Sequence, residues 1–304
     1  MTPTPPKLFD SAQLQMHRDR AAKTYGEYDF LKRRESSQLI ERLEDVSRTF
    51  STVLDFGTHD GTAAEMLAQH DQVGSVEAVE LSDGFRQLAE ARGVSVRSLQ
   101  GEAFDLPAER YDLVTSILAL HWVNDLPGAL IQIKQALKPD GLFLGCLFGA
   151  GTLNELRTSL LEAEAEVTGG ATPRVSPLPG LQDMAGLLQR AGFALPVVDV
   201  APVTVRYGDP FKLLADLKGM GEQAAFAPNE KAPRRPLSPR ILARMAQIYA
   251  ERFSDPDGRM RATFNVVWLS GWAPDANQPK PLRPGSAKHS LADAVRKAGE
   301  SNDK

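Results

Sequence analysis

The stretch Leu54-Asp55-Phe56-Gly57-Thr58-His59-Asp60-Gly61 decides the fold. It starts in an apolar run, Val53 to Phe56, and passes through two glycines into a segment with helical periodicity, Thr62 to His70. A strand that turns through glycine into a helix gathers backbone N–H groups and the positive end of the helix dipole around one point. We therefore predict that a carboxylate or phosphate binds at this turn, and that Asp55 faces an ammonium group.

The alternation of apolar runs and helical segments continues beyond this turn. Further apolar runs lie at 76–81, 94–99, 111–120 and 142–148. Continuous apolar strands separated by helices are typical of a parallel sheet that is covered on both faces. Lys138-Pro139-Asp140-Gly141 is interpreted as a turn before the fifth run. We predict an α/β fold with a doubly wound, mostly parallel sheet of seven strands, in which 196–207 and 262–269 form an antiparallel edge.

Composition excludes several classes of function. The 304 residues include 35 Lys and Arg against 39 Asp and Glu, a net charge of −4, which argues against a nucleic-acid partner and against an anionic membrane surface. No apolar run approaches the length of a membrane span, and the first residues lack the core of a signal peptide. Cys146 is the only cysteine, which fits a reducing compartment. We predict a cytoplasmic protein without an integral membrane segment.

Two more acidic side chains follow the next two apolar runs. Glu80 ends the second run, where a carboxylate can accept both hydroxyls of a ribose. Glu102 follows the third run, where a carboxylate can accept an adenine amino group, with Ala103 beside it. Each acid alone also fits a solvated strand end, but the ordered set with Asp55 favours an adenosyl ligand. A dehydrogenase would need Gly-x-Gly-x-x-Gly, which Gly57 to Gly61 does not supply.

These features define a candidate cofactor site and a candidate catalytic residue. The residues assigned to the cofactor are Asp55, Gly57, His59, Gly61, Glu80, Leu81, Glu102, Ala103 and Leu118. His121 and Trp122 follow the fourth run, at the sheet edge where ligands bind in open α/β folds. A histidine that titrates near neutral pH can act as a general base, so His121 is the candidate catalytic residue, although a half-buried structural histidine is the plainer interpretation.

No metal site is predicted. The five histidines show no ligand spacing, and one cysteine excludes a thiolate cluster. The two histidines and one carboxylate of an iron hydroxylase are not readable either.

Taken together, the motifs resemble a known superfamily. The Asp-x-Gly-x-x-x-Gly pattern from Asp55, the acid Glu80, the Leu106-Pro107 segment and Lys138-Pro139-Asp140-Gly141 resemble the class I S-adenosylmethionine-dependent methyltransferases. This resemblance implies a Rossmann-like fold and S-adenosyl-L-methionine as the cofactor.

A narrower likeness covers nearly the whole chain. It lies in Leu120-His121-Trp122-Val123-Asn124-Asp125-Leu126-Pro127-Gly128, in Leu187-Leu188-Gln189-Arg190-Ala191-Gly192-Phe193 and in Asp216-Leu217-Lys218-Gly219-Met220-Gly221-Glu222, among other segments. These segments resemble the family of mitochondrial complex I assembly factors with arginine hydroxylase activity, which would make this chain a bacterial homologue. The resemblance implies a protein substrate in respiratory complex I (NADH dehydrogenase). In that family the modified group is an arginine of an iron–sulfur subunit. The biotin-pathway malonyl-carrier-protein methyltransferase is a more distant relative.

We predict that the chain consists of four parts. Residues 1–50 form an N-terminal helical lead, and residues 51–150 form the Rossmann-like core that binds the cofactor. Residues 151–273 complete the sheet and add a helical region for the substrate or partner. Residues 274–304 are polar with little periodicity, which predicts a disordered tail.

One departure from the superfamily keeps the function open. His59 stands where the superfamily usually has glycine, and a Cβ with an imidazole there crowds the cofactor or forces a different loop path. Arg18 and Arg20 either close over the cofactor carboxylate or pair on a helix surface. The candidate functions are a protein methyltransferase or related arginine hydroxylase, a non-catalytic complex I assembly factor, and a malonyl-carrier-protein O-methyltransferase.

Overall fold

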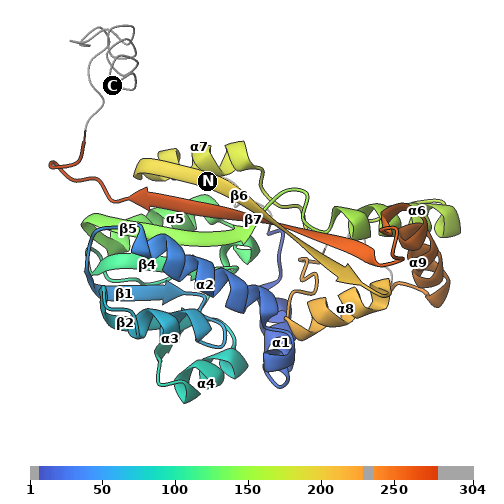
Figure 1. Ribbon diagram of the computed structural model, residues 1–304, viewed down its shortest axis with the longest axis horizontal. Coiled ribbons are helices and arrows are strands. Elements are labelled where there is room, and N and C mark those ends of the chain that lie inside the picture. The colour runs from blue at the N-terminus through green and yellow to red at the C-terminus, as the bar shows by residue number, and fades with distance from the viewer. Residues whose placement is uncertain (1–6, 229–235, 280–304) are drawn as a thin grey trace, which may run out of the picture. The chain divides into compact units, whose positions relative to one another are not determined.

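A seven-stranded sheet forms the centre of the computed structural model, which describes residues 7–228 and 236–279 (Figure 1). The strands are β1 (Phe50–Phe56), β2 (Val73–Glu80), β3 (Ser95–Ser98), β4 (Tyr111–Ile117), β5 (Leu137–Phe148), β6 (Ala194–Tyr207) and β7 (Met260–Trp272). Their order in the sheet is β3-β2-β1-β4-β5-β7-β6. Strands β1 to β5 pair in parallel, whereas β7 pairs antiparallel with both β5 and β6. The predicted doubly wound sheet with an antiparallel edge is confirmed.

The helices follow the predicted alternation. They are α1 (Ser11–Ala21), α2 (Phe30–Glu44), α3 (Thr62–Ala68), α4 (Asp83–Ala91), α5 (Leu126–Ala136), α6 (Asn154–Thr168), α7 (Leu181–Ala191), α8 (Pro210–Gly219) and α9 (Pro239–Phe253), with short 3-10 turns η1 (Tyr25–Glu27) and η2 (Leu120–Trp122). No helix within the described ranges has both the length and the apolar surface that crossing a bilayer requires.

Both faces of the parallel strands are buried, which explains why the strands read as continuous apolar runs. Val53 of β1 belongs to the same buried cluster as Leu39 of α2, on one face. The next residue, Leu54, belongs to the cluster that contains Leu130 of α5, on the other face. Because successive side chains of a strand point to opposite faces, a sheet covered on both sides needs an apolar residue at nearly every position.

The interpretation of Lys138 to Gly141 as a turn before the fifth strand was wrong. Strand β5 already begins at Leu137. Asp140 has a left-handed φ of 61°. The pairing of β5 with β4 shifts register between Tyr111 and Leu113. The residues typical of a turn therefore form an irregularity within the strand, as bulges do.

The long strands β6 and β7 extend past the parallel strands and carry α6, α8 and α9 at their far ends (Figure 1). Beyond the stretch that pairs with β5, β7 continues to pair with β6 from Asn265 back to Met260. Apolar side chains of this extension, such as Met260 and Phe264, belong to the same buried cluster as Leu39 of α2 and Val53 of β1.

The chain divides into two units, Met1–Pro274 and Asp275–Lys304. Most of the predicted disordered tail, residues 280–304, lies outside the described residues. The division of the first unit into a lead, a core and a C-terminal part stays a prediction.

Candidate functional site

Asp55 and the loop after it occupy the carboxyl end of β1. The Asp55 side chain is fully buried. Its Oδ1 accepts a hydrogen bond from Thr115 Oγ1 of β4 at 2.9 Å, and its Oδ2 has no partner in the structure. Gly57 has a φ of 67°, and a Cβ on it would lie 2.4 Å from the Cβ of Ala119. The loop therefore needs glycine at this position, and one buried carboxylate oxygen of Asp55 has no hydrogen-bond donor among the described residues.

His59 takes the backbone conformation that glycine usually supplies. Its φ is 55°, in the left-handed region. The imidazole is buried beside Phe85, with ring centroids 5.1 Å apart, and beside Tyr25 at 6.4 Å. Burial lowers the pKa of His59 well below its ordinary value, and the positive charges of Lys32, Arg18 and His121 lower it further. Both ring nitrogens lack a hydrogen-bond partner, so a neutral imidazole with free donor and acceptor capacity lies in this site.

Glu80 is fully buried at the end of β2, and both of its oxygens are engaged. Oε2 accepts a hydrogen bond from the backbone N–H of His59 at 2.8 Å, and Oε1 accepts from the backbone of Leu81 and Ser82 at 2.9 and 3.0 Å. Arg18 Nη1 of α1 lies 3.6 Å from Oε1. The carboxylate thus ties the loop after β1 to the start of α4. Its predicted bond to a ribose stays a prediction.

Arg18 lies inside the site, so the interpretation as a pair on a helix surface is wrong for this residue. The side chain is buried, and within the described part of the chain its Nε and Nη2 have no hydrogen-bond partner. Helix α1 is fixed there by Asp19, whose Oδ1 accepts hydrogen bonds from Ser82 Oγ at 2.6 Å and from the Gly84 backbone at 3.0 Å. The guanidinium therefore brings unused donors into a region that also holds the free oxygen of Asp55.

Lys32 is a buried residue of this region that the sequence interpretation missed. Its Nζ donates hydrogen bonds to the carbonyls of Ile117 at 2.8 Å and of Gly57 at 3.4 Å. Burial lowers the pKa of Lys32, whereas the nearby carboxylates of Asp55, Asp60 and Glu80 act in the opposite direction. The available signal was a lysine next to Leu31 in the helical lead, and the sequence analysis gave it no role.

Glu102 binds the protein rather than an open space. Its Oε1 accepts from the backbone N–H and side-chain Nδ2 of Asn124 at 3.0 and 2.7 Å, and its Oε2 accepts from the Asp125 backbone at 3.0 Å. Asn124 Oδ1 in turn accepts from the backbone of Leu8 and Phe9, each at 2.7 Å. The carboxylate thereby joins the start of α5 to the N-terminal segment. Its predicted contact with adenine stays a prediction.

The other residues predicted to contact the cofactor are Leu81, Leu118, Ala103 and Gly61. Leu81 packs against Phe9 and Trp122. Leu118 is buried with a φ of 50°, and Ala103 is exposed. Gly61 begins α3 at a φ of 83°, where a Cβ would lie 2.8 Å from the Cβ of Ala89, so glycine permits close packing of α3 on α4. The roles of these residues as cofactor contacts stay predictions.

His121 and Trp122 converge on a residue that the sequence interpretation did not assign. The Nε2 of His121 lies 3.0 Å from Glu222 Oε2, and Trp122 Nε1 donates to the same oxygen at 2.7 Å. Burial raises the pKa of Glu222, but the charge and hydrogen bond of His121, with Arg18 and Trp122, outweigh burial and hold the pKa below its ordinary value. Glu222 was present in a segment that carried the family resemblance, but nothing local marked it as part of this cluster.

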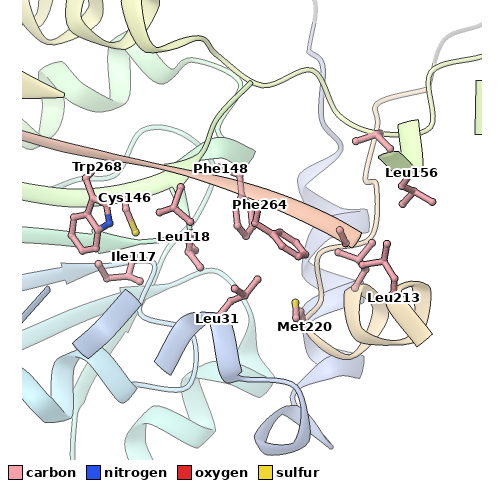
Figure 2. Close-up of a cluster of buried hydrophobic side chains, with 14 of the residues drawn as sticks. Leu31, Ile117, Leu118, Cys146, Phe148, Leu156, Leu213, Met220, Phe264 and Trp268 are labelled. Atoms are coloured by element: carbon pink, nitrogen blue, oxygen red, sulfur yellow. The ribbon is translucent and has the colours of Figure 1, made fainter. Parts of the chain in front are cut away.

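A cavity of about 850 Å³ opens beside this cluster. Its wall includes His121, Trp122 and Glu222, but not Asp55, His59 or Glu80. The other lining side chains are mostly aliphatic or aromatic and include Phe148, Leu153, Leu156, Leu160, Leu217, Phe226, Leu242 and Phe264. Figure 2 shows Phe148, Phe264 and Leu156 among the apolar side chains of this part of the core. The His121 cluster therefore borders a large apolar cavity, whereas the predicted cofactor residues lie outside its lining.

Within the described ranges, no group of three or more His, Cys, Asp or Glu side chains could hold a metal ion. His289, one of the five histidines, lies outside those ranges.

The sequence of this chain is similar to those of several known proteins. A methyltransferase domain model matches residues 25–196. The mitochondrial arginine-hydroxylase NDUFAF5 of Danio rerio is 37% identical over 290 residues, which cover 94% of this chain and 89% of the relative. The human protein of the same name is 38% identical over 88% of this chain and 76% of its own length. The malonyl-[acyl-carrier protein] O-methyltransferase of Halorhodospira halophila is 34% identical, over 90% of this chain and 91% of the relative.

Solved structures share the fold at low sequence identity. The YcgJ protein of Bacillus subtilis has a TM-score of 0.54 at 14% identity, covering 78% of this chain and 98% of that protein. Phosphoethanolamine N-methyltransferase 2 of Haemonchus contortus, solved in complex with S-adenosyl-L-methionine, has a TM-score of 0.53 at 16% identity, covering 86% of this chain and 60% of that one. At these identities the likeness concerns the fold alone.

Proposed function

Because this chain belongs to the methyltransferase-domain family and has its Rossmann-like fold, we propose that it is an enzyme that modifies a protein substrate during the assembly of respiratory complex I. Its cofactor is S-adenosyl-L-methionine. The reaction is methylation, or the arginine hydroxylation that the name of the mitochondrial relatives specifies, which would require a separate oxidant. We place the protein in the bacterial cytoplasm, and its partner is a complex I subunit, with an iron–sulfur subunit as the first candidate.

The observation that carries this proposal is a set of buried polar atoms without partners near the end of β1. Asp55 Oδ2 can only accept hydrogen bonds, whereas Arg18 Nε and Nη2 can only donate them. A buried polar group without a partner costs about 1–3 kcal/mol. The amino-acid end of S-adenosyl-L-methionine carries an ammonium group for Asp55 and a carboxylate for Arg18, so the residues present fit this cofactor. The free nitrogens of His59 offer a further contact.

The chain's own contribution to methyl transfer is to position an acceptor and to take up its proton. S-adenosyl-L-methionine, when bound, would supply an electrophilic methyl group. His121 Nδ1 is buried and without a partner, while Nε2 is held by Glu222. A proton leaving the acceptor can therefore go to His121 Nδ1. Most of the remaining rate enhancement comes from alignment of the two reacting atoms, which requires no elaborate set of catalytic groups.

Calorimetry and mass spectrometry test this proposal in two steps. Titration of the wild-type protein with S-adenosyl-L-methionine is expected to show binding at one site, and a flat titration would reject the proposal. Mass spectrometry of complex I subunits from a deletion strain then identifies the reaction. A subunit that lacks one methylene indicates methylation, and one that lacks one oxygen atom indicates hydroxylation.

Two alternatives each have a supporting observation. The 34% identity to a malonyl-[acyl-carrier protein] O-methyltransferase, over 91% of that relative, supports a carrier-protein substrate. Rescue of a biotin auxotroph by this chain would favour that function. A non-catalytic assembly factor is supported by His59, which adds a buried imidazole to the loop where the superfamily usually has glycine. Normal complex I assembly with a variant that no longer binds the cofactor would favour it.

A further inference from the structure

The Glu222 carboxylate is built into the wall of the large cavity with one oxygen held and the other free. Both of its hydrogen bonds, from His121 and Trp122, go to Oε2. No described residue donates a hydrogen bond to Oε1, and Glu222 lines the cavity. Two donors on one oxygen fix the orientation of the carboxylate, so that Oε1 can accept a hydrogen bond from a group inside the cavity.

The rest of the cavity wall is suited to a long apolar stem. Phe148, Leu156 and Phe264 are among the side chains that surround the space. The other ionic group of the lining, Arg174, is already paired with Glu164 at 2.5 Å, and both side chains are largely buried. The charge of Arg174 is therefore matched within the protein, which leaves Glu222 as the charged group of the lining with an unused hydrogen-bonding atom.

We propose that Glu222 is the residue that selects the acceptor, by binding the cationic head of a basic side chain, a guanidinium in the first place, whose aliphatic stem lies in the apolar cavity. This inference rests on the proposed function, because it specifies the chemical class of the group presented to the same site. A guanidinium is planar, always charged and more weakly hydrated than an ammonium group, so it loses less on entering an apolar cavity. Its N–H groups match a carboxylate oxygen.

The same geometry bears on the choice between the two kinds of relative. Glu222 is ionised at neutral pH despite its burial, because its pKa lies below the ordinary value. A malonyl group is itself an anion, and it would meet a like charge at the end of the cavity. An arginine side chain would meet an opposite charge, so Glu222 favours a basic protein substrate.

The test measures selectivity for charge in the full-length protein, with two small probes of similar shape. They are n-butylguanidinium and n-pentanoate, titrated with and without saturating S-adenosylhomocysteine. The indole N–H resonance of Trp122 reports directly on Glu222, to which it donates a hydrogen bond. The indole of Trp268 donates to Glu35 at 3.1 Å, outside the cavity lining, and provides an internal control.

We expect n-butylguanidinium to shift the Trp122 resonance and not the Trp268 resonance. It should bind at least about tenfold more tightly than n-pentanoate, because a hydrogen bond to a charged group contributes that much to the affinity. Glu222→Gln should abolish this preference. Glu35→Gln is the matched control, because Glu35 is also buried and also accepts from a tryptophan indole, and it should retain the preference.

Equal affinity for the two probes in the wild type, or a preference that survives in Glu222→Gln, would overturn the inference. If Glu222→Gln does not fold, the ratio of the two probe affinities measured with the wild-type protein tests the inference by itself. The two proposals fail in different ways. Absence of S-adenosylhomocysteine binding rejects the proposed function, whereas cofactor binding without guanidinium selectivity rejects only the role of Glu222.

Discussion

Asp55 presents one carboxylate oxygen without a partner, and at the scale of single residues this atom gives the most direct prediction about the cofactor. Asp55→Asn keeps the shape of the side chain but replaces one acceptor oxygen by a donor. We expect the affinity for S-adenosyl-L-methionine, measured by calorimetry, to fall by about 10- to 100-fold, as for loss of a hydrogen bond to a charged group. Asp199→Asn, at an ion pair with Arg42 on the edge strand β6, should leave the affinity unchanged. Equal affinities in the two variants would contradict a role for Asp55.

Gly57 gives a second prediction at this scale, concerning stability. Gly57→Ala places a Cβ 2.4 Å from the Cβ of Ala119 in a left-handed backbone conformation. We expect a loss of about 2–4 kcal/mol in the free energy of unfolding, measured by urea denaturation, from strain and overpacking together. Gly93→Ala is the matched control, because its φ is 82° but no atom lies within 4 Å of the added Cβ. It should lose only the conformational part, about 1 kcal/mol.

The sequence could predict Asp55 and Glu80 as neighbours because parallel strands end at a common edge. It could not predict Lys32 or Glu222. Lys32 enters the site from α2, and its partners are backbone carbonyls, which no sequence pattern marks. Glu222 meets His121 across 101 positions of the chain, and only the folded structure shows that contact.

At the scale of secondary structure, the Asn124 side chain ties the N-terminal segment to the loop before α5. Asn124 accepts from the backbone of Leu8 and Phe9, and it donates to Glu102. Asn124→Ala removes these bonds, so we expect the Phe9 amide to lose most of its protection in hydrogen exchange, while β1 amides keep theirs. Asn154→Ala, at the start of α6, is the control and should leave the Phe9 amide protected. Unchanged protection of Phe9 in Asn124→Ala would show that other contacts hold the segment.

The elements themselves were largely predictable, because a buried parallel sheet requires runs of apolar residues that turn signals separate. Helix α7, for example, spans Leu181 to Ala191 and ends where Gly192 takes a left-handed conformation, which is a typical stop signal. Lys138 to Gly141 was misread for a physical reason. Proline, aspartate and glycine favour a turn locally, but pairing with β4 on one side and β7 on the other draws the end of this segment into the sheet as an irregular start of β5.

At the scale of the whole molecule, a mostly parallel sheet with an antiparallel edge follows from the sequence pattern, and the cavity does not. The strands could be predicted because each needs only its own apolar run. Their order departs from the sequence order where the chain crosses from β3 to β4 and where β7 lies between β5 and β6. The cavity is enclosed by residues from η2, α6, α8, α9 and the segment around Phe226. Its walls depend on how these elements pack, and an apolar side chain that lines a cavity has the same sequence signature as one that fills a core.

Folding as a whole should depend on pH through the buried imidazole of His59. The folded protein holds this pKa well below 6.5, mainly by burial, whereas the unfolded chain titrates near 6.5. Between these values the unfolded state binds one proton more, so stability falls as the pH is lowered through about 6.5, with a slope of up to about 1.4 kcal/mol per pH unit. Urea denaturation between pH 7.5 and 5, a range set by the unfolded pKa of about 6.5, measures this slope. His59→Asn should flatten it, whereas His70→Asn, in the turn after α3, should not. His17 is also buried in part and has a lowered pKa, so some slope should remain in His59→Asn. An equal slope in all three proteins would contradict a neutral, buried His59 in the native state.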